Sequence, residues 1–291
     1  MKHVGLVYNA TNPRSVALQE RATAWCRANG MSVWTSPAAD APRLRANLAG
    51  SDVLLILGGD GTLLRAVVAV ADGDVPLLGI NTGKVGFLSK AEAEQLEEVL
   101  AKVRDGAFEI EPRMVLEATI VSGGQGGQPG PVGAAGGSAR GGRFVALNEA
   151  AIVRGSQARI IRLDVTIDST HLATYQADGL IVATPTGSTG YSFSAGGPIL
   201  DPSSRNLVVT PIAAYLAGIR SVVVGPRHVV TVRVEAAHDV LVSIDGQTDL
   251  LLAVGDSVQV RARERPIRFV QPSGTPSFWD LLRRKAELLP P

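Results

Sequence analysis

The chain has 291 residues, with 28 Lys and Arg against 27 Asp and Glu, for a net charge of +1. This balance gives no bulk attraction to nucleic acid or to a membrane surface, so neither is expected as a partner. The 45% hydrophobic content is typical of a globular protein with one large or two ordinary domains. Four histidines and one cysteine, Cys26, show no zinc-type ligand spacing, so no metal-ligating residues are predicted. A lone cysteine fits a reducing cytoplasm.

The first third of the chain alternates predicted strands with predicted helices. Apolar runs of a length typical of buried strands predict strands at 4–8, 32–35, 53–57 and 75–80. The start of the chain, residues 1–9, reads as this first strand and not as a signal peptide with a long apolar core. Apolar residues at helical spacing predict a helix that begins at Pro13 and another over 96–103. Strands that alternate with helices favour a parallel sheet covered on both faces, so we expect an α/β domain over residues 1–111.

The pattern changes near Pro112, after which short β-branched runs recur between turn residues. Many alternate apolar and polar residues, as in 229–234, which is typical of antiparallel strands with one buried face. The expected fold class is therefore α/β followed by β, with an antiparallel sandwich-like domain over residues 112–272. A final helix at 276–291 is expected to pack back on the first domain. Residues 122–142 are almost entirely Gly, Ser, Gln, Pro and Ala, which predicts a flexible loop rather than a nucleotide-binding one.

The most informative segment is Gly-Gly-Asp-Gly-Thr at residues 58–62. It follows the apolar run 53–57 and leads into a helical pattern, which predicts a buried strand, a tight glycine turn and a helix. Open α/β sheets bind ligands at the carboxyl ends of their strands, and helix amino termini attract phosphate. A carboxylate in that setting, Asp60, suits a general base that takes a proton from a hydroxyl near phosphate. An ordinary Asp-Gly turn is the structural alternative.

A second glycine-rich segment, residues 79–88, also follows a predicted strand. Its three glycines and Asn81 predict a loop whose backbone can line a pocket, and Phe87 can cover an adenine or nicotinamide face. Because aromatic side chains usually pack in cores, a core position for Phe87 is an equal alternative.

Asn148 and Glu149 form an adjacent polar pair within a β pattern. Neighbouring residues of a strand point to opposite faces, so one of the two is expected to be buried. An unpaired buried amide or carboxylate is unfavourable, and a ligand is one way to satisfy it. Asn suits an adenine edge, and Glu suits ribose hydroxyls. The alternative is a strand end at which both side chains are solvated.

The richest segment, residues 178–199, runs from Asp178 through an apolar strand into a loop dense in hydroxyls and glycine. Small hydroxyls and exposed amides can bind ribose, phosphate or carboxamide, and Tyr191 adds a stacking surface with a polar tip. A loop without function is the alternative, and the Gly-x-Ser-x-Gly elbow of serine hydrolases is absent here. Asp-Gly-Gln at 245–247 is a weaker signal, because Asp-Gly is a standard hairpin turn.

In this order, the four main segments resemble the pattern of the NAD kinase family over nearly the whole chain. The Gly-Gly-Asp-Gly-Thr piece is shared with diacylglycerol and sphingosine kinases and, more loosely, with phosphofructokinases, whereas residues 178–198 are specific to NAD kinases. Gly190 stands where the family commonly has Ala, and the 122–142 insertion is longer and richer in glycine than the family pattern. The resemblance implies an amino-terminal α/β domain and a carboxyl-terminal β domain, with the site between them.

The resemblance also implies transfer of a phosphoryl group from ATP, or from polyphosphate, to the adenosine 2′-hydroxyl of NAD, which forms NADP. Asp60 would be the general base, Gly61 and Arg65 would hold phosphate, and Mg²⁺ would be bound mainly through the donor phosphates. Family members are homodimers or homotetramers with the dinucleotide site bordered by a second subunit. The residues implied for dinucleotide binding are Phe87, Asn148, Glu149, Arg159, Gln176, Asp178, Thr189, Gly190, Tyr191, Ser192, Ser194 and Gln247.

Two other functions compete with this one. A lipid kinase of the diacylglycerol type is disfavoured by the near-neutral charge and by the polar loop at 184–194, a poor lining for acyl chains. A regulator that senses NADP without catalysis is disfavoured by Asp60, because binding alone needs no base. A cytoplasmic NAD kinase therefore remains the expected function.

Overall fold

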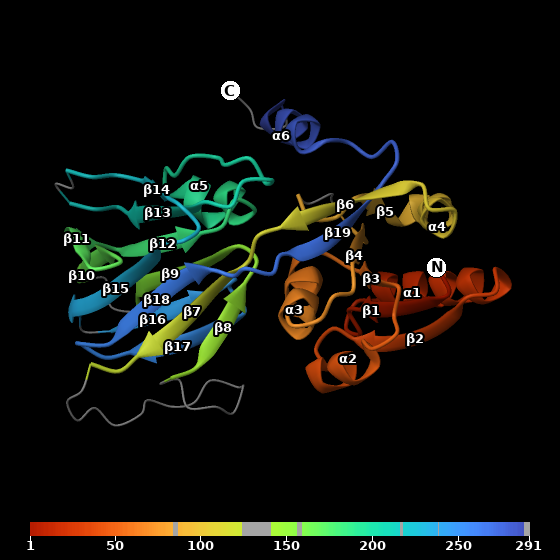
Figure 1. Ribbon diagram of the computed structural model, residues 1–291, viewed down its shortest axis with the longest axis horizontal. Helices are drawn as coiled ribbons and strands as arrows, with labels where there is room; N and C mark the ends of the chain where they lie inside the picture. The colour runs from red at the N-terminus through yellow and green to blue at the C-terminus, as the bar shows by residue number, and fades with distance from the viewer. Residues whose placement is uncertain (84–86, 124–140, 156–158, 216–217, 238, 288–291) are drawn as a thin grey trace. The chain divides into compact units, whose positions relative to one another are not determined.

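The computed structural model describes residues 1–83, 87–123, 141–155, 159–215, 218–237 and 239–287. Most of the predicted loop at 122–142 lies outside these residues. The chain forms two compact units, one of Met1–Pro112 with Ile267–Pro291 and the other of Arg113–Pro266 (Figure 1). No helix among the described residues is long and apolar enough to cross a membrane.

The first unit is built on one mainly parallel sheet. Its strand order is β2 (Ser32–Pro37), β1 (His3–Tyr8), β3 (Val53–Leu57), β4 (Leu77–Asn81), β19 (Ile267–Pro272) and β6 (Phe108–Arg113), and β5 (Ala91–Glu92) also pairs with β4. β1 to β4 are parallel to their neighbours, with Val4 opposite Val53 and Leu54 opposite Leu77. All five residues of β3 are buried, as expected for a strand covered on both faces. The predicted α/β domain with a parallel sheet is confirmed.

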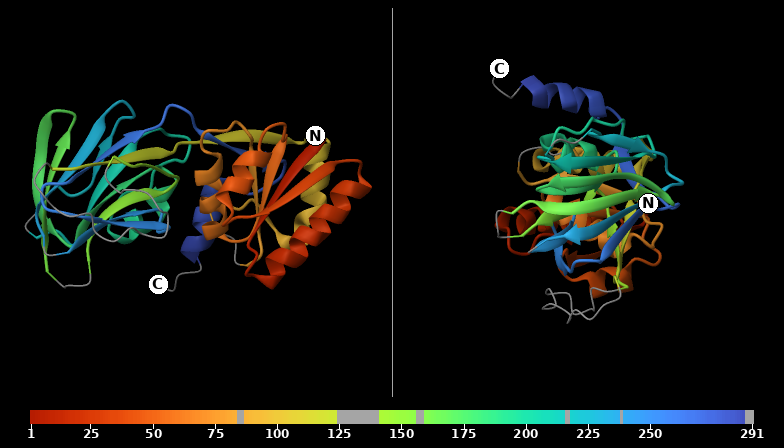
Figure 2. Two further views of the ribbon diagram at one scale, coloured as in Figure 1. Left: turned by 90° about the horizontal axis from the view of Figure 1, so that it is seen from below. Right: turned by 90° about the vertical axis from the view of Figure 1, so that its left-hand side faces the viewer.

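Helices cover both faces of this sheet (Figure 2). On one face α1 (Pro13–Ala28) packs with α4 (Leu96–Arg104), and on the other α2 (Ala41–Asn47) packs with α3 (Asp60–Val70). α1 begins where the Asn12 side chain accepts a hydrogen bond from the backbone of Arg14, with Pro13 in the first turn. Its buried face carries Cys26, and burial raises the pKa of this thiol to about 11.

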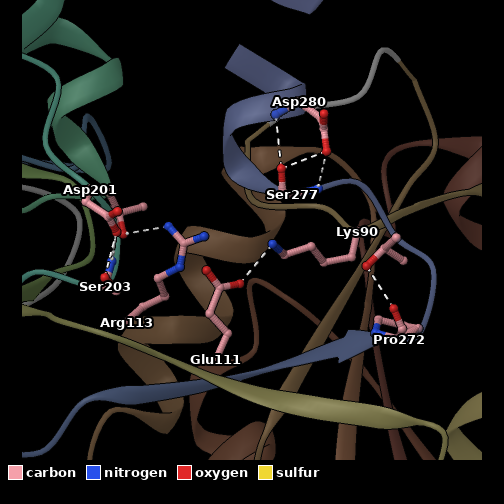
Figure 3. A network of polar contacts seen from close by, with 10 residues as sticks. Lys90, Glu111, Arg113, Asp201, Ser203, Pro272, Ser277 and Asp280 are labelled. Atoms are coloured by element: carbon pink, nitrogen blue, oxygen red, sulfur yellow. Dashed lines mark hydrogen bonds and ion pairs between the residues drawn. The ribbon is translucent and has the colours of Figure 1, made fainter. Parts of the chain in front are cut away.

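The last strand returns to the first unit. The expected antiparallel domain over residues 112–272 includes this strand, but β19 runs parallel to β4 in the first sheet, with Phe269 opposite Leu77. The run Ile-Arg-Phe-Val predicts a strand in either sheet, because its alternation specifies a buried face and not a partner. α6 (Phe278–Glu287) follows in the same unit, and its start is capped by reciprocal hydrogen bonds between Ser277 and Asp280 (Figure 3).

The second unit contains two six-stranded antiparallel sheets. One has the order β11 (Thr170–Ala177), β10 (Ile161–Ile167), β15 (Val229–Ala236), β18 (Ser257–Ala262), β7 (Leu116–Val121) and β8 (Arg143–Ala146). The other has the order β14 (Val222–Val224), β13 (Leu207–Ile212), β12 (Gly179–Ala183), β9 (Glu149–Arg154), β16 (Val240–Ile244) and β17 (Thr248–Leu252). Side chains of both sheets form one core, rich in Val, Ile and Leu. The predicted antiparallel sandwich-like domain is confirmed.

The outer face of the second sheet is covered by the segment that follows β12. Ile181, Ala183 and Val208 form a smaller apolar cluster there, against which Ala195 and Leu200 pack. β12 is therefore buried on both faces, which accounts for its continuous apolar sequence. The segment after β12 folds back over β12 itself. Its hydroxyl-rich part, residues 184–194, is thereby held against the sheet.

Candidate functional site

In the first unit, Asp60 stands where the buried strand β3 passes into a helix. A Cβ at Gly58 would lie 2.5 Å from Thr62 Oγ1, so this close turn requires glycine. α3 begins at Asp60 after Gly59, which gives no side-chain cap to the first turn. The Asp60 side chain is exposed on the first helical turn, where the helix dipole favours a negative charge. The turn thus combines a solvent-accessible carboxylate with the end of a helix that attracts phosphate.

Gly61 and Arg65 lie on the exposed side of the same helix. The opposite side of α3 is apolar and buried, with Leu63 and Ala66 facing the core. A Cβ at Gly79 in β4 would lie only 2.9 Å from Leu63, so glycine lets the helix pack closely on the sheet. Close packing fixes the start of α3, and with it Asp60, relative to the strands.

The second glycine segment is held by local contacts. Asn81, at the end of β4, is buried and its Oδ1 accepts a hydrogen bond of 2.9 Å from Gly83 N. Residues 84–86 of this segment lie outside the described residues. Phe87 is half-buried, with its ring centroid 5.9 Å from that of Phe278 in α6. This aromatic neighbour comes from the far end of the chain, and the sequence did not predict it.

A buried ion pair follows that segment. The Lys90 side chain is almost fully buried, and its Nζ lies 2.9 Å from Glu111 Oε2 in β6 (Figure 3). Its backbone N–H also donates to Gly79 O at 3.0 Å. Separating the two side chains would leave a buried charge without a partner, which is unfavourable. The pair therefore holds Lys90 and the glycine segment before it close to β6.

In the second unit, Asn148 and Glu149 lie at the start of a strand. β9 begins at Glu149, so the two residues do not alternate within one strand as expected, and both are half-buried. Glu149 Oε2 is buried and has no hydrogen-bond partner among the described residues. Burial, followed by the charge of Asp245, raises the pKa of Glu149 from 4.5 to about 8. A buried carboxyl oxygen of this kind marks a place for a polar ligand.

Asp245 holds the backbone on which this pair stands. It lies in the turn between β16 and β17, which confirms the predicted hairpin. Its carboxylate accepts hydrogen bonds of 2.8 to 2.9 Å from the backbone N–H groups of Leu147, Asn148 and Glu149. Burial raises the pKa of Asp245, and these hydrogen bonds oppose that rise. The sequence showed only a turn residue here, because Asp245 is 97 positions away from Asn148 along the chain.

The hydroxyl loop, residues 184–194, holds the same backbone from the other side. Thr184 Oγ1 donates to Leu147 O at 2.5 Å, and Thr184 N donates to Asn148 O at 2.8 Å. A Cβ at Gly187 would lie 2.2 Å from Asn148 O, so only glycine permits this approach. The predicted binding segments at 148–149 and 184–194 are therefore in direct contact.

Residues of the hydroxyl loop divide into exposed and buried groups. Gly190, Tyr191 and Ser194 are exposed and Thr189 is half-buried. Ser192 is instead buried, with its Oγ 3.1 Å from Thr210 Oγ1 in β13. The structure thus gives Ser192 a role in anchoring the loop to the sheet.

The remaining candidates are more dispersed. Asp178 lies just before β12, and its Oδ1 is 2.8 Å from Arg154 Nε of β9. This pair fixes the orientation of the half-buried Asp178 carboxylate beside the start of the strand. Gln176, Arg159 and Gln247 are all exposed, in β11, ahead of β10 and in the β16–β17 turn respectively.

Two family models match the chain, one on each unit. The model for the ATP-NAD kinase N-terminal domain matches residues 31–108, and the model for the ATP-NAD kinase C-terminal domain matches residues 147–272. The chain is also 40% identical to a NAD kinase of Symbiobacterium thermophilum, over 98% of this chain and 99% of that protein. It is 34% identical to a NAD kinase of Syntrophotalea carbinolica, over 98% of each.

Solved structures agree with these matches. A NAD kinase from Archaeoglobus fulgidus, in complex with ATP, has a TM-score of 0.75 and 26% identity, over 99% of this chain and 100% of that chain. A yeast NADH kinase, complexed with NADH, shares the fold with a TM-score of 0.80 and 24% identity, over 99% of this chain and 87% of that one. The chain therefore belongs to the NAD kinase family, and its activity is that of a NAD kinase, a phosphotransferase.

Proposed function

We propose that Asp60 is the general base that activates the adenosine 2′-hydroxyl of NAD. Its carboxylate takes the hydroxyl proton as the 2′-oxygen attacks the γ-phosphorus of ATP, and the bond from that phosphorus to the ADP oxygen breaks. The products are NADP and ADP. The observation that carries this role is the exposed Asp60 carboxylate on the first turn of α3, after the buried strand β3. Polyphosphate is the alternative donor.

Donor phosphates fit the same turn. The amino-terminal end of α3 attracts negative charge, and Gly61 adds no side chain that would keep a phosphate away. Arg65, exposed on the same helix, supplies a cation for the charge that spreads over the transferred group. Phosphoryl transfer depends mainly on positioning and charge neutralisation, which these groups provide.

Binding of NAD is assigned to residues of the second unit and to Phe87. Glu149 Oε2 is buried without a partner, and a ribose hydroxyl would satisfy it. Asn148 supplies a donor and an acceptor on the adjacent residue, and the exposed Tyr191 ring offers a stacking surface. Weaker contributions are assigned to Arg159, Gln176, Asp178, Thr189, Gly190, Ser194 and Gln247.

A magnesium ion fits this donor set. Mg²⁺ keeps several waters and usually takes one or two carboxylates together with substrate phosphates, so it needs no protein cage. Asp60 is a carboxylate beside the proposed phosphate position, and the ATP phosphates would supply most of the other ligands. When bound, the ion would neutralise charge on those phosphates.

The proposal extends to the assembly of the protein and to its location. We assign a homodimer or homotetramer, which is supported by the exposed Tyr191 and Phe193 side chains on the hydroxyl loop. The cytoplasm is supported by the buried, unpaired Cys26.

The test is formation of NADP by the purified protein with NAD, ATP and Mg²⁺, read through an NADP-specific dehydrogenase. Turnover with NAD and its absence with 2′-deoxy-NAD would support the proposal. Saturable NAD binding without turnover for any donor would favour a regulator instead. Phosphorylation of diacylglycerol vesicles, with no reaction of NAD, would favour the lipid kinase.

A further inference from the structure

Asp245 is a buried carboxylate that the proposed chemistry does not use. It is 5% exposed and sits in the β16–β17 turn with a backbone φ of +50°. Few non-glycine residues adopt this left-handed conformation, although aspartate tolerates it better than most. The next residue, Gly246, has a φ of +61°. Two successive left-handed residues form a type I′ turn, which aims the Asp245 side chain at the neighbouring strand β9.

Both oxygens of Asp245 are occupied by one short stretch of backbone. Oδ2 accepts from Leu147 N at 2.8 Å, and Oδ1 accepts from Asn148 N and Glu149 N at 2.8 and 2.9 Å. The backbone N–H of Asp245 in turn donates to Glu149 O at 3.0 Å. Four hydrogen bonds therefore join this single residue to residues 147–149.

The carbonyl groups of that stretch are held from the opposite direction. Thr184 takes up Leu147 O and Asn148 O, and Gly187 packs against the Asn148 carbonyl. The backbone is thus fixed on both sides, while Glu149 Oε2 stays without a partner among the described residues. A binding group whose backbone is fixed loses little further freedom when the ligand arrives.

We propose that Asp245 is a positioning residue that fixes the Asn148–Glu149 backbone for the acceptor NAD. The inference rests on the proposed binding role of this pair. The carboxylate is specifically required, because both of its oxygens accept backbone N–H groups. An asparagine of the same shape would place its NH₂ group against at least one backbone N–H, which is a donor facing a donor.

The test compares Asp245→Asn with a matched control, Asp256→Asn. Asp256 is equally buried, at 5% exposed, and its carboxylate also accepts two backbone N–H groups, from Ala253 and Gly123. Both variants are expected to lower the melting temperature. Only Asp245→Asn is expected to raise KM for NAD, by roughly tenfold for one lost buried hydrogen bond, with KM for ATP unchanged. Amide hydrogen exchange at 147–149 should increase in that variant alone.

Equal KM values for NAD in the two variants, or unchanged exchange at 147–149 in folded Asp245→Asn, would overturn the inference. Failure of the wild-type protein to form NADP would instead defeat the proposed function, whereas the exchange result would still stand. If Asp245→Asn does not fold, Gly246→Ala perturbs the same turn without changing the carboxylate, through backbone strain alone, because Gly246 has a φ of +61° and no atom lies within 4 Å of the added Cβ. It should raise KM for NAD and leave KM for ATP unchanged, and no change in either would also overturn the inference.

Discussion

The Asp60 turn and the Asn148–Glu149 segment carry complementary halves of the proposed chemistry in opposite physical settings. Asp60 is exposed and stands on the first turn of a helix. Residues 147–149 are held by Asp245 and Thr184 through buried and partly buried hydrogen bonds. A base that takes a proton from substrate must be accessible to it, whereas a binding segment gains from a fixed backbone.

The largest effect is expected where access matters. Asp60→Asn keeps the size of the side chain but removes the base, so kcat should fall by about 100- to 10,000-fold. The affinity for NAD, measured by isothermal titration calorimetry, should be largely kept. Unchanged turnover would contradict the general-base role.

The second prediction concerns the buried carboxyl of Glu149. Its pKa is raised from 4.5 to about 8, so the folded, ligand-free protein keeps a proton that the unfolded chain releases. Stability should therefore fall as pH rises from about 4.5 to 8, and this contribution should level off above that range. Glu149→Gln should remove this dependence and become the more stable protein at high pH, by an amount on the order of a few kcal/mol.

Urea unfolding of both proteins at pH 5.5, 7 and 8.5 checks this prediction. If the difference in unfolding free energy between the wild type and Glu149→Gln stays constant across these pH values, the pKa of Glu149 is not raised in the folded protein. The slopes of the unfolding curves should match, because the substitution does not change the area exposed on unfolding.

The third prediction tests how tightly the binding segment is held. Gly187→Ala forces a Cβ to within 2.2 Å of Asn148 O, and overpacking of this kind destabilises a protein by about 1–3 kcal/mol. Gly190→Ala in the same loop is the matched comparison, since its Cβ would lie 3.4 Å from Gly187 O. Its unfolding free energy should stay within about 0.5 kcal/mol of the wild type. Equal losses of unfolding free energy in the two variants would show that the loop shifts to make room for the Cβ at position 187.

The smallest effect is expected at the Arg154–Asp178 ion pair. Both side chains are about a third or more exposed, so the pair is screened by water and contributes at most about 1 kcal/mol. Arg154→Gln should raise KM for NAD less than about fivefold, measured in the coupled assay. Arg104→Gln, which breaks a pair with Asp105 in the first unit, is the control and should leave KM unchanged.

Local patterns along the chain predicted much of the fold. The run 53–57 followed by Gly-Gly-Asp-Gly predicted β3, the turn and α3, because strand burial and helix start are both encoded within a few residues. α2 was missed, although Asp40 caps it and Pro42 stands in its first turn, signals that were present in the sequence. β17 was also missed, because only Leu250 and Leu252 of its five residues are buried and its first two residues are polar, so it lacks the continuous apolar run that marks β3.

The contacts that shape the site depended on pairings distant in sequence. Asp245 and Thr184 bind the same three-residue stretch from positions about 35 to 100 residues further along the chain. The sequence predicted Asn148 and Glu149 as binding residues, but no local pattern shows which other residues hold their backbone. The same reason explains β19, whose partner strand no local pattern specifies.

Because the thiol of Cys26 in α1 is buried, fluorescent dyes can be attached at chosen positions of the protein to measure its movements. Cys26 is the one cysteine of the sequence. With a pKa of about 11 its thiol stays protonated at neutral pH, and burial keeps thiol reagents from reaching it. A cysteine introduced at an exposed position would react alone with a maleimide dye. Two such positions, one in each unit, would carry a fluorescent pair whose energy transfer reports any movement as nucleotides bind.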